Sequence, residues 1–193
     1  NSIATAPLQN PMYRQDVVPL KEKLELLGFG SFSLTDYFGP QTEQAVKDFQ
    51  KYYGLSVDGI AGESTINKLN SEASTPFQNG ERDSKTVQLK EYLHTLGFWE
   101  SESGTTLYAS QTEQAVKEFQ QAFGLRVSGV ADSKTWSKLE GEATGPLKNP
   151  MYREDAITLK EGLERLGFGS FALTDYFGPQ TEKTVRNFQS HIS

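Results

Sequence analysis

The sequence predicts an all-α protein made of tandem three-helix bundles, two of them complete and one truncated. Two observations support this fold class: a block of sequence occurs three times, and each copy spaces its apolar residues at the period of an α-helix. Glycine and proline stand where those helices would end or begin. We therefore divide the chain into unit A (residues 1–74), unit B (residues 75–144) and unit A′ (residues 145–193).

The three copies are not equally similar. Residues 7–14, PLQNPMYR, return in unit A′ as PLKNPMYR at residues 146–153. Unit B lacks this segment, but its residues 111–117 repeat QTEQAVK of residues 41–47 without change. Duplication of a two-unit block explains why A and A′ match each other best. We expect both ends to be cut, since residues 1–5 read like the tail of an earlier unit and unit A′ stops before a third helix.

The first helix of each unit is predicted from a leucine-rich stripe. In unit A it starts after Asp16, a residue type that caps helices. Gly28 follows as a left-handed stop, and Phe29 is placed to pack back onto the last turn. The stripe consists of Val17, Leu20, Leu24 and Leu27 in unit A, Val87, Leu89, Leu93 and Leu96 in unit B, and Ile157, Leu159, Leu163 and Leu166 in unit A′.

Two further helices complete the predicted bundle. The second begins at Pro40, where the missing N–H of proline is harmless, and ends at Gly54. The third follows a turn at residues 57–62 and carries Ile66 and Leu69. Polar linkers are expected at residues 71–76 and 141–146. The second stripe comprises Ala45, Val46, Phe49 and Tyr53 in unit A, Ala115, Val116, Phe119 and Phe123 in unit B, and Thr184, Val185 and Phe188 in unit A′.

Composition excludes several classes of function. The net charge of −6 argues against nucleic acid, which calls for Lys/Arg patches, and against electrostatic docking on a membrane surface. No apolar run approaches the ~20 residues that cross a bilayer. The chain has no Cys, and neither His94 nor His191 belongs to a zinc motif or a catalytic triad. We expect no metal, no cofactor and no catalytic residue, because no Asp/Glu pair stands out for glycoside hydrolysis either.

The motifs of unit A resemble the bacterial peptidoglycan-binding-domain family. The resemblance rests on LGF at residues 27–29, YFGPQTEQAVKDFQ at residues 37–50 and GLSVDGIAGEST at residues 54–65. It implies a non-catalytic targeting module that is secreted and holds a murein hydrolase on the cell wall, with a glycan strand or a stem peptide as its ligand. Unit B departs from the pattern at Ala109, Ser110, Ser128 and Asp132, so binding is expected of unit A and left open for B and A′.

Ligand contacts are expected first from aromatic residues, whose flat faces suit sugar rings. Tyr37 and its counterpart Tyr176 stand beside a helix start, where free N–H groups attract a carboxylate of a stem peptide. Gln41 and Gln180 lie one turn further along. Tyr13 and Tyr152 belong to NPMYR, which forms either a ligand lip or a contact surface between units. The remaining candidates are Trp99 and Tyr108 in unit B, and Asp58, whose other expected role is to organise its turn.

Two alternatives stay open. The same fold serves equally in a structural or adhesive repeat protein that contacts other proteins and has no affinity for glycan. In unit A′, the missing third helix should leave an apolar patch on the first two helices, which favours self-association through that patch. Finally, we expect Phe49 to be buried and the following Gln50 to tie down a turn.

Overall fold

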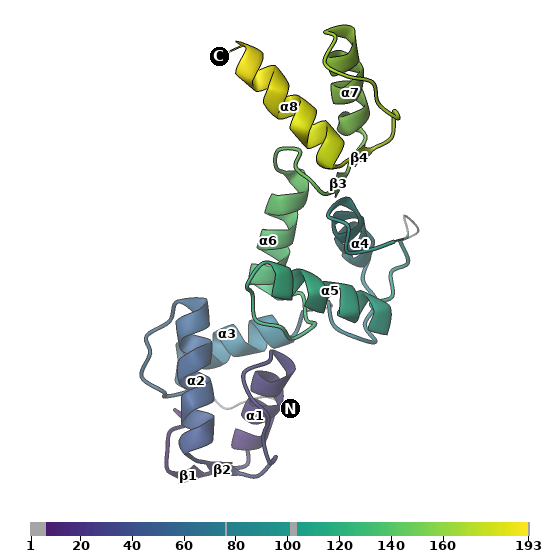
Figure 1. The fold of residues 1–193 in the computed structure, drawn as a ribbon. Helices are drawn as coiled ribbons and strands as arrows, with labels where there is room; N and C mark the ends of the chain where they lie inside the picture. The colour runs from purple at the N-terminus through teal and green to yellow at the C-terminus, as the bar shows by residue number, and fades with distance from the viewer. Residues whose placement is uncertain (1–6, 76, 101–103, 193) are drawn as a thin grey trace.

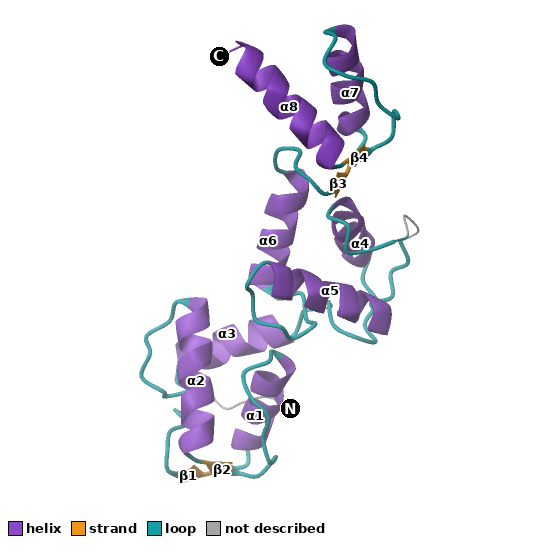
Figure 2. Cartoon of the chain, viewed as in Figure 1, coloured by secondary structure: helices purple, strands orange, loops and turns teal. Residues whose placement is uncertain are grey.

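The computed structural model describes residues 7–75, 77–100 and 104–192, and the helices in it fall into three successive groups (Figures 1 and 2). Two short antiparallel ribbons, β1–β2 and β3–β4, accompany the first and third groups. The helices are α1 (Val17–Leu26), α2 (Pro40–Tyr53), α3 (Glu63–Ala73), α4 (Lys85–Thr95), α5 (Ser110–Ala122), α6 (Ser133–Thr144), α7 (Asp155–Arg165) and α8 (Pro179–Ile192). The strands are β1 (Met12–Tyr13), β2 (Tyr37–Phe38), β3 (Met151–Tyr152) and β4 (Tyr176–Phe177). The predicted all-α class is confirmed.

Each complete bundle buries most of the stripes that the sequence predicts. Val87 is an exception, because Thr86 takes the position of Val17 in the repeat and is fully buried, whereas Val87 is half-buried. The α1 stripe packs against α2 and α3, and α4 packs in the same way against α5 and α6. Phe49 and its counterpart Phe119 lie at the centre and are fully buried. The residues with no more than 2% exposure include Leu20, Leu24, Leu27, Val46, Ile66 and Leu69 in unit A, and Leu89, Leu93, Val116 and Leu139 in unit B.

The helix ends confirm the glycine predictions and correct one cap. Gly28 has a φ of 79°, and the N–H of Phe29 donates to the Leu24 carbonyl at 2.8 Å. Gly54 ends α2 with a φ of 72°. Asp16 precedes α1, but its carboxylate pairs with Arg14 and caps no backbone N–H. The reason is that Asp16 is already helical, with ψ near −3°, so its side chain does not face the free N–H groups.

The predicted linkers are largely helical, which corrects a second expectation. α3 continues to Ala73, and α6 runs past Gly141 to Thr144. Burial explains the extension: Ala73 follows Leu69 by four residues, and Ala143 follows Leu139 by four, so both prolong the apolar stripe. Pro76, at the end of the first linker, lies outside the described residues, as do residues 1–5.

A buried lysine holds the long loop of each unit, a feature that the sequence did not reveal. Lys21 donates to the carbonyls of Ser33 at 3.2 Å and Thr35 at 3.0 Å. Lys90 and Lys160 do the same for the loops before α5 and α8. Burial lowers the pKa of Lys21 and Lys90. The loop is thus fixed where it delivers Tyr37 to the start of α2.

A polar joint connects units A and B. The Tyr53 hydroxyl donates to Asp132, which lies at the start of α6. Arg126 donates to the Gly28 carbonyl at 2.6 Å and lies over the ring of Phe29, 4.1 Å from its centroid. Val130 of unit B is 3% exposed and belongs to the core of unit A. The joint therefore combines a small apolar contact with charge-assisted hydrogen bonds.

Glu72 gives this joint a pH dependence. Its buried carboxylate accepts from the Ser133 N–H at 2.8 Å, from the Ser133 hydroxyl at 2.6 Å and from Lys68. Burial alone would raise the pKa of Glu72, but the hydrogen bonds from Lys68 and Ser133 together lower it. The stabilisation is therefore present above the unfolded value of 4.5 and is lost as the pH falls through the lower folded pKa.

We expect Glu72→Gln to remove part of the acid sensitivity of the protein. Urea unfolding followed by helical circular dichroism, from about pH 7 down to about pH 3, would measure it. The wild-type midpoint should fall more steeply below about pH 4.5 than the midpoint of the variant. Equal slopes would mean that Glu72 does not couple protonation to folding. Glu63→Gln, an exposed change on the same helix, serves as the matched control.

The second joint, between unit B and unit A′, is more apolar. Met151, Ala156 and Phe177 of unit A′ are no more than 3% exposed and belong to the core of unit B. Arg153 donates to the carbonyls of Ala143, at 3.1 Å, and Gly145, at 2.5 Å, and so satisfies free acceptors near the C-terminal end of α6. Units B and A′ therefore share one continuous core.

Candidate ligand-binding surface

The β1–β2 ribbon brings two of the predicted tyrosines together. Tyr13 lies opposite Tyr37 in the register, and their ring centroids are 4.7 Å apart. Tyr152 and Tyr176 form the same pair in unit A′, with centroids 4.8 Å apart. The side chain of Tyr13 is 71% exposed, so unit A presents an open aromatic face. Sequence reasoning named all four residues but did not pair them.

Gly39 makes room for this tyrosine pair. A Cβ at Gly39 would overlap the ring of Tyr37, and Gly178 stands in the same relation to Tyr176. In unit B the corresponding residues are Leu107 and Ala109, and no such pair forms there. Unit B therefore lacks both the glycine and the aromatic face.

The glutamine at the second position of α2 and of α8 contacts the neighbouring loop. Gln41 donates to the Ser31 carbonyl at 2.9 Å, and Gln180 donates to the Ser170 carbonyl at 3.2 Å. Both side chains stand at the exposed start of a helix whose free N–H groups favour an anion. In unit A′ a hollow of about 280 Å³ opens here, lined by Lys160, Phe171, Thr174, Tyr176, Pro179 and Gln180 among others. The structure thus brings Tyr176 and Gln180 to one hollow.

Asp58 and Gln50 organise the turn before α3. The Gln50 amide donates to Asp58 at 2.8 Å and to the Ile60 carbonyl at 3.0 Å, and its oxygen accepts from the Gly59 N–H at 2.9 Å. Asp58 in turn accepts from the Ile60 N–H at 2.9 Å. The hydrogen bonds from Ile60 and Gln50 lower the pKa of Asp58. The expectation that Gln50 ties down a turn is confirmed, the structure identifies it as the turn before α3, and the contacts of Asp58 support the same role.

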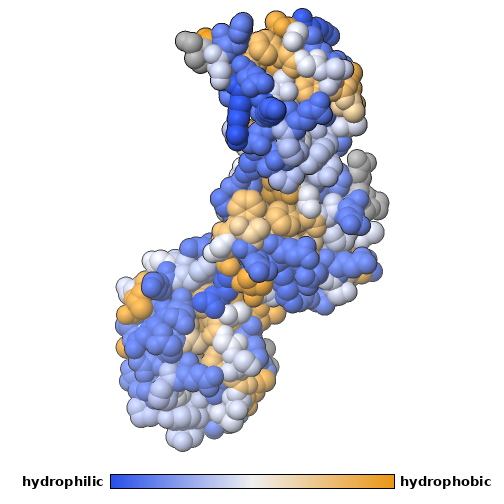
Figure 3. All heavy atoms as spheres, viewed as in Figure 1, coloured by the Kyte–Doolittle hydropathy of each residue, from blue (hydrophilic) through white to orange (hydrophobic). Residues whose placement is uncertain are grey.

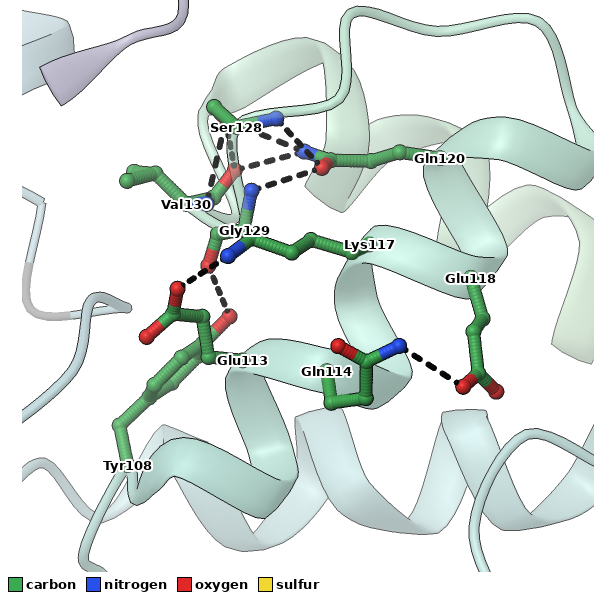
Figure 4. A network of polar contacts seen from close by, with 9 residues as sticks. All are labelled: Tyr108, Glu113, Gln114, Lys117, Glu118, Gln120, Ser128, Gly129 and Val130. Carbon is green, nitrogen blue, oxygen red and sulfur yellow. Dashed lines mark hydrogen bonds and ion pairs between the residues drawn. The ribbon is translucent and has the colours of Figure 1, made fainter.

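Unit B repeats this network with different residues (Figure 4). Gln120 points its amide into the turn and accepts from the N–H groups of Ser128 and Gly129 at 3.0 and 2.9 Å. The Ser128 hydroxyl accepts from the Val130 N–H, as Asp58 does in unit A. The replacement of aspartate by Ser128 therefore preserves the turn.

Tyr108 has to be removed from the candidate ligand contacts. Its side chain is fully buried, and its hydroxyl donates to the Gly129 carbonyl at 2.7 Å. The repeat explains this placement, because Tyr108 occupies the position of the buried Phe38 rather than that of Tyr37. Burial raises the pKa of Tyr108.

Trp99 is half-buried rather than an open platform. Lys90 lies over its ring, 5.4 Å from the centroid. Trp99 lines a hollow of about 420 Å³, together with Gln111, Gln114 and Glu118 among others. Trp99 stands at the position of Gly30 in unit A, so this hollow flanks the same helix face on which Gln41 meets its loop. Residues 101–103 of the same loop lie outside the described residues.

The tyrosine pairs of A and A′ differ in their surroundings. Tyr152 is 36% exposed, and its ring centroid lies 5.6 Å from that of His94 in α4. A Cβ at Gly97 would also come within 3.7 Å of Tyr152. The NPMYR segment of unit A′ therefore contacts the preceding unit, whereas Tyr13 lies in the first unit of the given sequence and is largely exposed there.

Comparisons with known proteins identify one family, which matches the chain in three places. The family model for the peptidoglycan binding domain matches residues 13–69, 82–139 and 152–192, which together make up most of the chain. Each match falls on one of the three groups of helices. No helix in residues 7–75, 77–100 or 104–192 is both long and apolar enough to cross a membrane.

Curated relatives include enzymes that act on bacterial walls. The N-acetylmuramoyl-L-alanine amidase CwlM of Mycobacterium tuberculosis is 41% identical over 59 residues, which are 31% of this chain and 14% of that protein. The amidase CwlL of Bacillus licheniformis is 28% identical over 152 residues, covering 64% of this chain and 42% of CwlL. A spore cortex-lytic enzyme of Oceanobacillus iheyensis is 36% identical over 62 residues, covering 32% and 22%. The chain spans less than half the length of each.

Proposed function

This chain belongs to the peptidoglycan-binding domain family, and from that premise we propose that it is a non-catalytic module that holds an exported protein on the bacterial cell wall. We further propose that the protein it serves is a secreted murein hydrolase of a Gram-positive bacterium. The names of the relatives support this assignment, since two are amidases and one is a cortex-lytic enzyme. Because each matches this chain over only part of its length, the shared part fits a binding module that accompanies different enzymes.

The open tyrosine pair of unit A is the observation that carries the proposal. The rings of Tyr13 and Tyr37, tilted by 30° with centroids 4.7 Å apart, offer an apolar face with polar tips, which is the chemistry that receives the C–H face of a sugar ring. Beside it, Gln41 and the first N–H groups of α2 present donors to a stem-peptide carboxylate. We propose that a glycan ring lies on the tyrosines while the start of α2 faces the peptide. Trp99, beside its hollow in unit B, is a second proposed contact.

Replacing the exposed tyrosine should separate binding from folding. We expect Tyr13→Ala to weaken retention on purified peptidoglycan sacculi about three- to tenfold, because one aromatic contact contributes ~0.5–1.5 kcal/mol. The melting temperature should stay within about 1 °C, since 71% of the side chain is already exposed. Tyr37→Ala should weaken retention similarly. A co-sedimentation titration measures both effects.

The matched control is Val57→Ala, an exposed residue of the same unit that lies outside the tyrosine pair. It should bind sacculi as the wild type does. If Tyr37→Ala lowers the melting temperature and the retention together, Tyr37 acts as a core residue. If Tyr13→Ala binds like the Val57 variant, the tyrosine pair is not the ligand surface.

A second candidate function has one specific observation in its favour. The same aromatic pair contacts a protein surface in unit A′, where Tyr152 meets α4 of unit B. A structural or adhesive repeat protein would use the open pair of unit A for such contacts. Full recovery of the chain in the supernatant of a sacculus assay, together with saturable binding to a purified partner protein, would favour this second function.

A further inference from the structure

A hollow of about 460 Å³ lies where units A and B meet. That volume falls within the ~300–1,000 Å³ that pockets for small molecules occupy. On the face drawn in Figure 3, hydrophilic and hydrophobic atoms lie side by side at the junction of the two units. Both units contribute to the lining, which includes Ser71, Glu72, Phe77, Lys85, Trp136 and Ser137. The hollow therefore belongs to the pair of units rather than to either bundle alone.

Unit B contributes an aromatic pair to this hollow. The rings of Phe77 and Trp136 stack, with their centroids 4.8 Å apart and their planes 13° from parallel. The corresponding residues of unit A, Leu8 and Ile66, are aliphatic and no more than 1% exposed. An aliphatic pair thus suffices to complete the core of a bundle, so packing alone does not require the two rings. Since Trp136 is only partly buried and borders the hollow, the pair adds an apolar wall to it.

The polar groups of the hollow fall into two classes. The carboxylates of Glu72 and Asp132 are no more than 6% exposed and already accept hydrogen bonds across the joint. The other groups can contact a ligand. The ammonium of Lys85 forms no ion pair with any residue that the structure describes, and Ser137 is exposed. The indole N–H of Trp136 also lacks an acceptor in the described part of the chain, and it is not buried. The hollow therefore offers hydrogen-bond donors beside an apolar wall.

We propose that this hollow binds one or two pyranose rings of an N-acetylated amino-sugar strand. The aromatic wall suits the C–H face of a sugar ring, and the N–H and O–H donors suit its hydroxyl and acetamido oxygens. The hollow disfavours a carboxylate of a stem peptide, because Glu72 and Asp132 place two negative charges in its lining against the single ammonium of Lys85. The inference rests on the proposed function, in that the strand is the glycan of the cell wall, but it assigns a site apart from the Tyr13–Tyr37 pair.

Di-N-acetylchitobiose, a neutral disaccharide without peptide, is the direct probe. Added to the isotope-labelled full chain, it should shift the indole N–H resonance of Trp136 saturably in nuclear magnetic resonance spectra. Trp136→Ile identifies that resonance by removing it, and the bundle should fold because unit A carries isoleucine at this position. The variant should bind the disaccharide at least about threefold more weakly, as measured at the backbone resonance of Ser137, because an aromatic contact is lost. Val127→Ala, at an exposed residue of unit B outside the hollow, should bind as the wild type does.

Retention on sacculi separates this inference from the function on which it rests. Retention with no saturable shift at Trp136 would overturn the hollow as a sugar site and leave the wall-binding function standing. A saturable shift without retention would support the hollow and overturn the function, and the absence of both would overturn both. Equal binding of the disaccharide by Trp136→Ile and the wild type would also overturn the inference. A stem peptide that shifts the Trp136 resonance when the disaccharide does not would make a peptide the ligand, with the same consequence.

Discussion

Gln120→Ala should destabilise unit B by about 3 kcal/mol or more. The buried amide satisfies the N–H groups of Ser128 and Gly129 and the carbonyl of Val130, the last at 2.9 Å. Alanine leaves these backbone groups without their partner in a region that water does not reach, and each unsatisfied buried group costs ~1–3 kcal/mol. The turn before α6 should loosen first. Gln50→Ala should have the same effect in unit A, through the turn at Asp58.

Urea unfolding monitored by circular dichroism measures the loss. Gln114→Ala is the matched control, because Gln114 lies on the same helix but is exposed and donates only to Glu118. Its effect should stay within about 0.5 kcal/mol. A Gln120 variant as stable as the Gln114 variant would show that the turn does not depend on the amide.

Asp132→Ala should destabilise the chain by about 1.5–5 kcal/mol, through the start of α6 and through the joint between units A and B. The Asp132 side chain is buried and caps α6, accepting from the Thr135 N–H at 2.8 Å. Losing a cap costs ~0.5–2 kcal/mol. The same carboxylate accepts from the Tyr53 hydroxyl, which would lose its partner at a further cost of ~1–3 kcal/mol. The total should appear in the unfolding free energy of the full chain.

A double-mutant cycle separates the two contributions. Tyr53→Phe removes the hydroxyl, so Asp132→Ala should cost less in that background than in the wild type. The remaining cost measures the cap alone. Ser133→Ala, one residue further along, keeps both contacts of Asp132 but removes the hydroxyl that donates to Glu72, so it measures that separate contact across the joint. Full additivity of the Tyr53 and Asp132 changes would show that the hydroxyl contributes nothing to the joint.

The sequence predicted the elements that depend on local spacing. The stripes of α1 and α2 and the left-handed stops at Gly28 and Gly54 follow from periodicity and from residue type. A turn held by Gln50 was also expected, but only the structure shows that it is the turn before α3. The lysine tether did not follow from periodicity or residue type. Lys21 has the residue type of a solvated helix face, and its acceptors are carbonyls of a loop more than ten residues away. A contact of that kind leaves no periodic signal.

The candidate site was predicted residue by residue but not as an arrangement. Tyr13 and Tyr37 were both named, yet only the ribbon places their rings in contact. Tyr108 shows the opposite case. Its aromatic ring suggested a ligand contact at the surface, but in the alignment of units A and B it occupies the position of Phe38, and both residues are buried. Alignment of the repeats was therefore a better guide to burial than side-chain type. The sequence also contained a sign of the polar joint, because Asp132 stands in unit B where unit A has Gly62.

The close approach of Tyr37 to Gly39 also means that a substitution at one of these positions changes which residues the other can accept. Alanine at Gly39 would overlap the present position of the Tyr37 ring, which would have to move, so the pair with Tyr13 depends on this glycine. Loss of the tyrosine, in turn, frees the glycine to change. Unit B carries both replacements, as Leu107 and Ala109, whereas units A and A′ carry neither. The two positions are epistatic, so a repeat of this kind keeps both residues or loses both, and a single reversion in unit B would not rebuild the aromatic face.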